Sequence, residues 1–242
     1  MDALWNDFLH WLNAIGVPVA QAAGQAGEAA RHGAEWAAGK LDMPGLLALA
    51  AALGWASGFR LYAVVFFTGL AGYLGWLALP PGLHLLTHPA MLAASGAMLF
   101  VEFFADKIPG LDSLWDIVHS AIRVPAGAAL AAAAFGADSA TMTAVVALMG
   151  GTLAATSQAA KTTTRAAINT SPEPFSNVGM SLVEDTTSLG AVWLAVSYPL
   201  VFGVLLIAVV ILSWLLTWAL WRFLKSVFRR VSAFFSPPQR VA

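Results

Sequence analysis

The charged side chains of this chain are concentrated in a few short stretches, and the richest runs from Phe100 to Arg123. It holds six charged residues and one histidine. The preceding run from Met91 to Ala105 is apolar enough for a membrane helix, yet Glu102 lies in its last turns and Asp106 follows it. A carboxylate inside a membrane helix is costly and marks a functional site by default. This stretch predicts a membrane protein organised around buried charge.

A second charged stretch, from Lys161 to Asp185, repeats the pattern with Glu184 on another apolar helix. Glu102 and Asp106 are four residues apart and share a helix face, with Glu184 and Asp185 as the carboxylates opposite them. Clustered carboxylates in a membrane interior suit a hard cation or a proton relay. The residues that we expect to bind a substrate or ion are Arg60, Glu102, Asp106, Lys161, Arg165, Glu184 and Asp185.

The composition supports a membrane protein. Hydrophobic residues make up 59% of the 242 residues and charged residues 10%, against roughly half and a quarter in soluble domains. This length accommodates about six spans of roughly 20 residues. The chain has no cysteine, which excludes disulfides and thiolate chemistry, and it lacks the basic, aromatic-bearing soluble face of a nucleic-acid-binding protein. The expected partners are the lipid bilayer and a small ion or solute, with assembly into a homo-oligomer left open and no cofactor expected.

We predict an all-α, polytopic membrane protein with about six transmembrane helices. The transmembrane domain covers residues 44–224, between an N-terminal amphipathic and Ala-rich interfacial segment, 1–43, and a basic amphipathic C-terminal tail, 225–242. Pro80, Pro81, Gly136 and Pro199 separate the apolar runs, because proline and glycine interrupt helices. The expected spans cover residues 44–79, 90–106, 115–135, 141–160, 177–196 and 200–223. The first is either one broken helix or a re-entrant segment plus a span.

The positions of lysine and arginine predict the orientation. The loops expected at 80–89, 136–140 and 197–199 contain neither residue type. Lys107, Lys161 and Arg165, together with the C-terminal cations, fall at the opposite ends of the spans and are expected in the cytoplasm. With six spans, both termini lie in the cytoplasm of a bacterium whose inner membrane holds the protein.

Two halves of the transmembrane domain, 44–136 and 141–224, are similar in pattern. Val101-Glu102 corresponds to Val183-Glu184, and Arg60 corresponds to Lys161 or Arg165. Two copies of a three-span unit enter the membrane in opposite directions, so we predict inverted repeats of the kind found in secondary transporters. The alternative is a similarity that any two halves of a six-helix protein would share.

Three segments also carry a family resemblance. They are GWASGFRLY, VEFFADKIPGLDSLWD and KTTTRAAINTSPEPFSN, the last followed by Glu184-Asp185. They resemble an uncharacterised bacterial membrane-protein family, the domain-of-unknown-function family numbered 4126, over about residues 46–224. The resemblance implies a membrane protein but no activity, so the function is argued from the residues.

The cations permit other interpretations. Arg60, Lys161 and Arg165 could bind an anion or an anionic lipid headgroup at a helix break near Gly54 and Gly58. Lys161 and Arg165 could instead extend to the membrane surface. Arg60 or Lys161 could pair with Glu102 and hold two helices together, because buried charges are normally paired.

Other polar residues are expected to support the structure. Ser113 and Asp116 resemble a capping box, and Asp116, His119 and Arg123 share one helix face. Metal binding by His119 is the alternative to a hydrogen-bonded histidine, and no metal is assigned. The supporting set comprises Lys107, Asp112, Asp116, His119, Asn169, Glu173 and Asn177.

No enzyme motif is convincing. Ser57 lies in Ala56-Ser57-Gly58, but Trp55 stands where an intramembrane serine protease motif needs glycine. The chain lacks GxxxxGK[ST] and HExxH. We therefore predict a secondary transporter or channel for a small ion or solute, with a cation or proton favoured. Anionic-lipid binding and a non-catalytic membrane scaffold are the alternatives.

Overall fold

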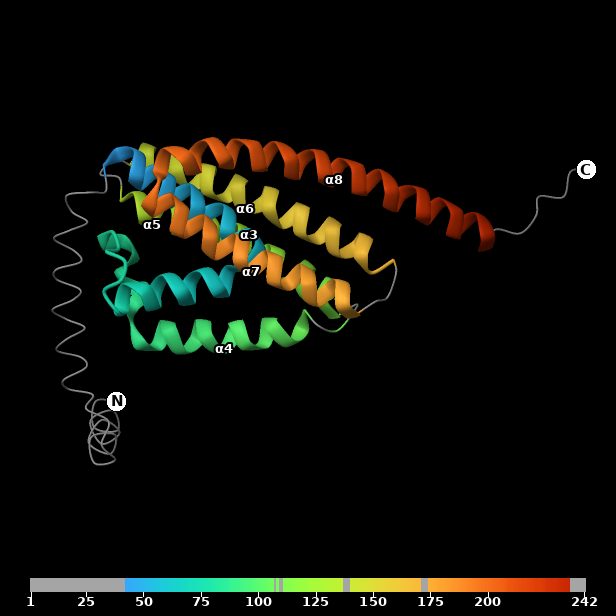
Figure 1. Ribbon diagram of the computed structural model, residues 1–242, viewed down its shortest axis with the longest axis horizontal. Helices are drawn as coiled ribbons and strands as arrows, with labels where there is room; N and C mark the ends of the chain where they lie inside the picture. Colours follow the sequence, from blue (N-terminus) through green and yellow to red (C-terminus); the bar gives the residue numbers. More distant parts are fainter. Residues whose placement is uncertain (1–41, 107, 109–110, 137–139, 171–173, 236–242) are drawn as a thin grey trace, which may run out of the picture.

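The computed structural model describes residues 42–106, 108, 111–136, 140–170 and 174–235 (Figure 1). The described residues form seven helices and no strand, which confirms the all-α prediction. The helices are α3 (Met43–Tyr73), the 3-10 helix η1 (Pro81–Thr87), α4 (Pro89–Ala105), α5 (Leu111–Phe135), α6 (Ala140–Ile168), α7 (Pro174–Ser197) and α8 (Pro199–Phe235). The predicted interfacial segment lies outside the described residues except at its end, as do Lys107, Glu173, the side chains of Asp112 and Asn177, and residues 236–242 of the tail.

Proline residues mark where several helices begin. Pro89, Pro174 and Pro199 open α4, α7 and α8, and Pro44 lies in the first turn of α3. Proline suits this position because the first helical N–H groups have no partner within the helix. The Asp42 side chain accepts a hydrogen bond from the Gly45 N–H at 3.0 Å and caps α3. An α-helix therefore occupies each of the six predicted span positions.

The helix α3 is broken at Arg60, whose φ of −144° and ψ of 68° are not helical. Before the break α3 runs parallel to α6, since Gly54 lies against Gly150 and Gly58 against Ala154. After the break α3 runs antiparallel to α4. Arg60 pairs with Asp106 beyond the end of α4, Phe66 lies against Gly96 near its middle, and Gly69 lies against Leu86 in η1.

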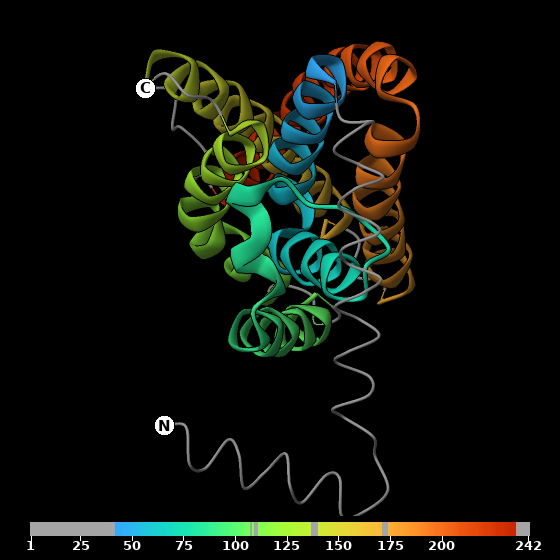
Figure 2. The same ribbon diagram turned by 90° about the vertical axis from the view of Figure 1, so that its left-hand side faces the viewer.

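The two halves of α3 thus form a hairpin with Arg60 at its tip. Both outer ends of the hairpin reach the same end of the bundle, which Figure 2 shows from that side. Gly82 of η1 also lies against Ala133 near the end of α5, which places these elements at that end too. A break was expected at Gly54 and Gly58. Instead, these glycines let α6 approach, because a Cβ at Gly54 would lie only 2.6 Å from the Gly150 Cα.

Among the described residues, four helical segments are long and apolar enough to cross a membrane: α3, residues 114–135 of α5, α6, and residues 199–226 of α8. The bent pair of η1 and α4, with 67° between them, makes a fifth if it is counted as one span. The protein is therefore a membrane protein with transmembrane helices. The first half of α3 is the most buried part of the described helices. Leu49, Leu53 and Ala56 are fully buried there, in the hydrophobic core.

The direction of the chain differs from the six-span expectation. Six spans would bring the beginning and end of the domain to the same end of the bundle. Because α3 turns back, α3 begins at one end and α8 finishes at the other (Figure 1). Lys161 and Arg165 also lie inside α6, which continues to Ile168, whereas the sequence placed them in a loop after residue 160. The helix α8 includes residues 225–235 of the predicted tail.

Candidate functional site

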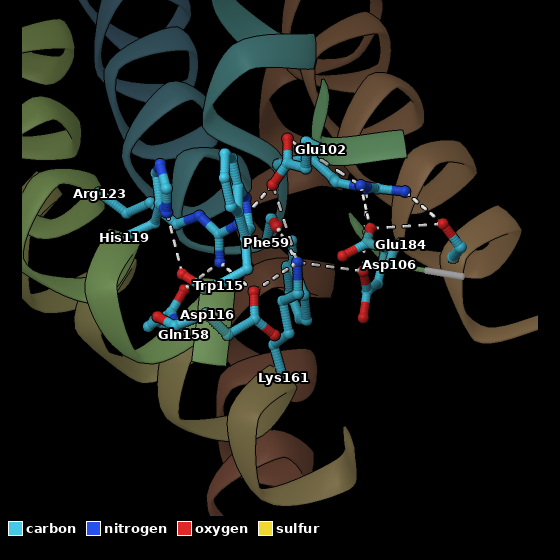
Figure 3. Close-up of polar contacts among 12 residues, drawn as sticks. Phe59, Glu102, Asp106, Trp115, Asp116, His119, Arg123, Gln158, Lys161 and Glu184 are labelled. Carbon is cyan, nitrogen blue, oxygen red and sulfur yellow. Dashed lines mark hydrogen bonds and ion pairs between the residues drawn. The ribbon is translucent and has the colours of Figure 1, made fainter. Parts of the chain in front are cut away.

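Nine charged side chains from five helices meet at the tip of the α3 hairpin, and we call them the ionic cluster. Figure 3 labels Glu102, Asp106, Asp116, Arg123, Lys161 and Glu184 among them. Each side chain of the cluster forms at least one ion pair with another member. Eight of the side chains are at most 1% exposed, and only Asp185, at 30%, is partly accessible. The members are Arg60 of α3, Glu102 of α4, Asp106 just after α4, Asp116 and Arg123 of α5, Lys161 and Arg165 of α6, and Glu184 and Asp185 of α7.

Arg123 joins α5 to α4 and α6. Its Nη1 donates to Asp116 Oδ1 and to Gln158 Oε1, both at 2.8 Å, and its Nη2 donates to Glu102 Oε1. The Gln158 amide nitrogen donates to the Asp116 backbone carbonyl at 3.2 Å. Arg123 therefore pairs with two carboxylates at once, which reduces the large cost of burying them.

Lys161 lies at the centre of the cluster, among oxygen atoms from four other helices (Figure 3). Its Nζ donates to the Phe59 carbonyl at 3.0 Å, next to the break in α3. The same nitrogen lies 3.1 Å from Asp116 Oδ1, 3.4 Å from Glu184 Oε2 and 3.9 Å from Glu102 Oε1. One ammonium group thus serves three carboxylates and a backbone carbonyl.

Arg60 connects α3 to α4 and α7. Its guanidinium donates to Asp106 and to the Ser181 hydroxyl, and its Nε lies 2.7 Å from Asp185 Oδ1. Glu184 and Glu102 are more distant, at 3.8 and 3.9 Å. Arg60 is therefore shared among four carboxylates.

Arg165 forms the most regular pair of the cluster. Its Nε and Nη2 approach the two oxygens of Glu184 at 3.1 and 2.9 Å, and its Nη1 donates to the Asp106 carbonyl at 3.2 Å. Two parallel bonds between guanidinium and carboxylate fix the geometry as well as the charge. This pair ties α6 to α7.

The cluster contains one more carboxylate than cations. Among the side chains that the structure describes, its four cations and five carboxylates leave a formal excess of one negative charge. Glu102 Oε2, Asp106 Oδ1 and Asp116 Oδ2 are buried without a hydrogen-bond partner. The Nε atoms of Arg60 and Arg123 are also without a hydrogen-bond partner, so the unpaired atoms of the cluster include donors as well as acceptors.

The cluster lies toward one end of the bundle. Glu102 is thirteen residues past the beginning of α4, about 20 Å along a helix that rises 1.5 Å per residue. Only Phe103, Phe104 and Ala105 follow it before α4 ends. The buried charges are therefore close to the turns that join α4 to α5 and α6 to α7.

The structure brings together all seven residues that the sequence proposed for binding. Lys161 and Arg165 are fully buried, so the prediction that they extend to the membrane surface is wrong. Glu102 forms ion pairs with Arg60 and Lys161, both at 3.9 Å, as the alternative interpretation predicted, but it pairs most closely with Arg123. The predicted site set omitted Arg123 and Gln158. The shared helix face of Asp116 and Arg123 was the available signal for the arginine.

Of the residues predicted to support the structure, some lie in the ionic cluster and others lie outside it. Asp116 belongs to the cluster, and Ser113 lies inside α5, which begins at Leu111, instead of preceding the helix. His119 Nδ1 lies 2.9 Å from the Trp115 carbonyl, and its ring stacks on Trp115 with centroids 4.0 Å apart. The Asn169 backbone N–H donates to the Arg165 carbonyl at 2.9 Å in the turn after α6. Within the described ranges, no three histidine, aspartate or glutamate side chains form a metal-binding group.

These features define an all-helical membrane protein with a buried ionic cluster. Residues 47–222 match the family described as "Domain of unknown function (DUF4126)". The chain belongs to this family, which confirms the resemblance seen in the sequence. Searches of the curated proteins and of the solved structures find no match.

Proposed function

We propose that this protein is a secondary transporter for a small cation, coupled to protons, and that the ionic cluster is its binding site. The fifth carboxylate of the cluster, Asp185, carries the proposal. The four fully buried carboxylates equal the four buried cations in number, and Asp185, which is 30% exposed, is in excess of them among the described residues. A partly exposed carboxylate in excess can accept a cation or a proton, and it connects the buried charges to the exterior.

The broken helix α3 supports the same function. Many secondary transporters bind ions where a membrane helix is interrupted, because the interruption presents backbone carbonyls to the ion. In this chain the interruption at Arg60 lies at the cluster, and the Phe59 carbonyl already holds the Lys161 ammonium. Irregular backbone at membrane depth occurs where it is buried in protein or lines a cavity.

We infer a location in the bacterial inner membrane with the end of α8 in the cytoplasm. Arg222 and Lys225 of α8 lie at that end, and the Arg222 guanidinium lies 4.8 Å from the centre of the Trp218 ring. Tryptophan is enriched at both membrane interfaces, and an excess of lysine and arginine marks the cytoplasmic one. With α3 as a re-entrant hairpin, we propose that α4, α5, α6, α7 and α8 cross the membrane, which adds α7 to the described segments that are apolar enough to do so and removes α3. Met43 then lies on the side opposite the end of α8. This arrangement replaces the expected six spans with both termini in the cytoplasm.

The inverted-repeat proposal has partial support. The helices α4 and α7, which carry Glu102 and Glu184, run in opposite directions, as do α5 and α8 (Figure 1). The first half of α3 runs parallel to α6, which an inverted repeat does not allow. We therefore propose that the first repeat begins after Arg60.

Flux in proteoliposomes tests the function. Gradients of H⁺, Na⁺, K⁺ and NH₄⁺ are imposed in turn, and the Glu102→Gln, Glu184→Gln double variant is compared with the wild type. We expect the double variant to lose flux while remaining folded, because each amide keeps the shape of the side chain and removes its charge. Asp42→Asn makes the same chemical change at the α3 cap, where asparagine serves as well as aspartate, and should retain flux.

A membrane scaffold is the second candidate, because every cation of the cluster already has a carboxylate partner. The same pairing disfavours anion binding by Arg60, Lys161 and Arg165, since an anion would have to displace a carboxylate. Wild-type protein that moves none of the four cations, but melts far lower when the cluster is altered, would favour the scaffold. We assign no enzymatic role, since Ser57 is buried and donates to the Gly54 carbonyl at 2.7 Å.

A further inference from the structure

We propose that one face of α8 binds an anionic phospholipid at the membrane surface, with the lipid phosphate held by Arg222 and Lys225. These two residues and Arg229 are exposed on this face, which we call the cationic face. The cationic face is separate from the ionic cluster, because the nine cluster residues lie on or next to other helices. The inference therefore stands apart from the transport proposal.

The three cations lie close together on the helix surface. An α-helix turns by about 100° per residue, so positions 222, 225 and 229 fall within about 60° of its circumference. Together with Ser226, these residues line a hollow of about 540 Å³. The Ser226 hydroxyl donates to the Phe223 carbonyl at 2.9 Å. The cations are therefore the groups in this hollow that an anion would contact.

Tryptophan side chains continue the same face toward the middle of α8. Trp214, Trp218 and Trp221 are each more than half exposed, and with the three cations they occupy about 100° of the helix circumference. The Arg222 guanidinium lies 4.8 Å from the centre of the Trp218 ring, so the aromatic and cationic parts are in contact. A face that is aromatic along one part and cationic along the next matches a molecule with apolar chains and an anionic headgroup.

The length of α8 places the cations at the level of the lipid headgroups. Residues 200–221 contain no charged side chain, and they span about 33 Å of helix, close to the roughly 30 Å of the hydrocarbon core. Lys225 lies about 4.5 Å beyond Arg222 along the axis. The headgroup layer on each side is about 5–8 Å thick, so both cations lie within it. A phosphate at this depth belongs to a lipid.

The neighbouring helices leave the cationic face open. Pro174, where α7 begins, is 24 residues before Tyr198 in the turn between α7 and α8, and Arg222 is 24 residues after it. Because the two helices are antiparallel, α7 begins at the level of Arg222. Figure 1 shows the rest of α8 extending beyond α6 and α7. The helix α8 also supplies no carboxylate, since Asp185 is the last acidic residue of the chain.

The two cations predict a measurable preference between lipids. Each lysine or arginine near the surface strengthens the attraction of anionic lipid by about fivefold. Arg222 and Lys225 together should therefore favour an anionic lipid over a zwitterionic one by about 25-fold.

Native mass spectrometry of the full chain measures this preference. The protein is held in micelles containing equal amounts of phosphatidylglycerol and phosphatidylcholine with identical acyl chains, and the lipids that remain bound are identified by their mass. The Arg222→Gln, Lys225→Gln variant should lose the 25-fold preference. The Arg222→Lys, Lys225→Arg variant keeps both charges and should retain it. Both variants should melt with the wild type, because the two side chains are exposed.

Lys225→Gln alone provides a second variant if the double change prevents folding, and it should lower the preference about fivefold. Wild-type protein that retains the two lipids equally, or a glutamine variant that retains phosphatidylglycerol as strongly as the wild type, would overturn the proposal. Inorganic phosphate in large excess should leave the lipid bound. Displacement of phosphatidylglycerol by inorganic phosphate would assign the cationic face to a free anion and would also overturn the lipid site.

Discussion

Arg123 and Glu102 are the two ends of one buried ion pair, so changing each end in turn separates pairing from charge balance. The pair joins Arg123 Nη2 to Glu102 Oε1, and both side chains are completely buried. Arg123→Gln removes a cation and leaves two negative charges in excess, with both Glu102 and Asp116 losing a partner. Glu102→Gln removes the excess charge. A simple ion pair would make the two changes equal in cost.

The structure predicts a large difference between the two variants. Removing one partner of a buried pair costs about 3–5 kcal/mol, and Arg123→Gln should cost at least this much because two carboxylates are affected. For a chain of this size, each kcal/mol lowers the melting temperature by about 2–4 °C, so we expect a decrease of about 6–20 °C. Glu102→Gln should cost no more than the roughly 1.5–3 kcal/mol of one charge-assisted hydrogen bond.

Tryptophan fluorescence during heating in detergent measures these effects, since the chain has ten tryptophans. The Arg123→Gln, Glu102→Gln double variant should melt above Arg123→Gln alone, because the second change removes a carboxylate that the first left unpaired. If Glu102→Gln melts as low as Arg123→Gln, or the double variant melts lowest, the inference of an excess carboxylate is incorrect.

Two further predictions concern packing and topology. Gly54→Ala should lower the melting temperature by an amount equivalent to about 1–3 kcal/mol, because the added Cβ meets α6. Gly190→Ala is the control and should be neutral or stabilising, since no atom lies within 4 Å of its added Cβ. Equal melting temperatures for the two variants would contradict the close packing of α3 on α6. The chain has no native cysteine, so single cysteines can be introduced at Met43 and Ser226. A thiol reagent should label these two positions from opposite sides of the membrane. Labelling of both from the same side would favour the six-span topology.

The positions of the helices and most members of the cluster could be predicted from the sequence. Proline residues bound the apolar runs, and charged residues in an apolar chain are few enough that each is conspicuous. Glu102 interrupts an otherwise apolar helix, and Glu184 follows Val183 as Glu102 follows Val101. These signals are local in the sequence, so they can be recognised without knowledge of the fold.

The sequence predicts a broken or re-entrant first helix, but the turn back at Arg60 and the pairing could not be predicted in the same way. The run from 44 to 79 is apolar on both sides of Arg60, so its hydropathy does not indicate that the chain turns back. Lys161 and Arg165 were placed in a loop because lysine and arginine usually end a span. They remain inside α6 because carboxylates from α5 and α7 surround them. Such compensation depends on contacts between distant helices.

Internal pH in proteoliposomes under an imposed K⁺ gradient is the most direct test of cation exchange at the ionic cluster. With K⁺ outside and a pH-sensitive dye inside, wild-type protein should exchange entering K⁺ for leaving protons, so the interior should become alkaline. The Glu102→Gln, Glu184→Gln variant should show no change above that of empty liposomes. An interior pH that stays constant with wild-type protein, or that rises equally with the double variant, would contradict the account.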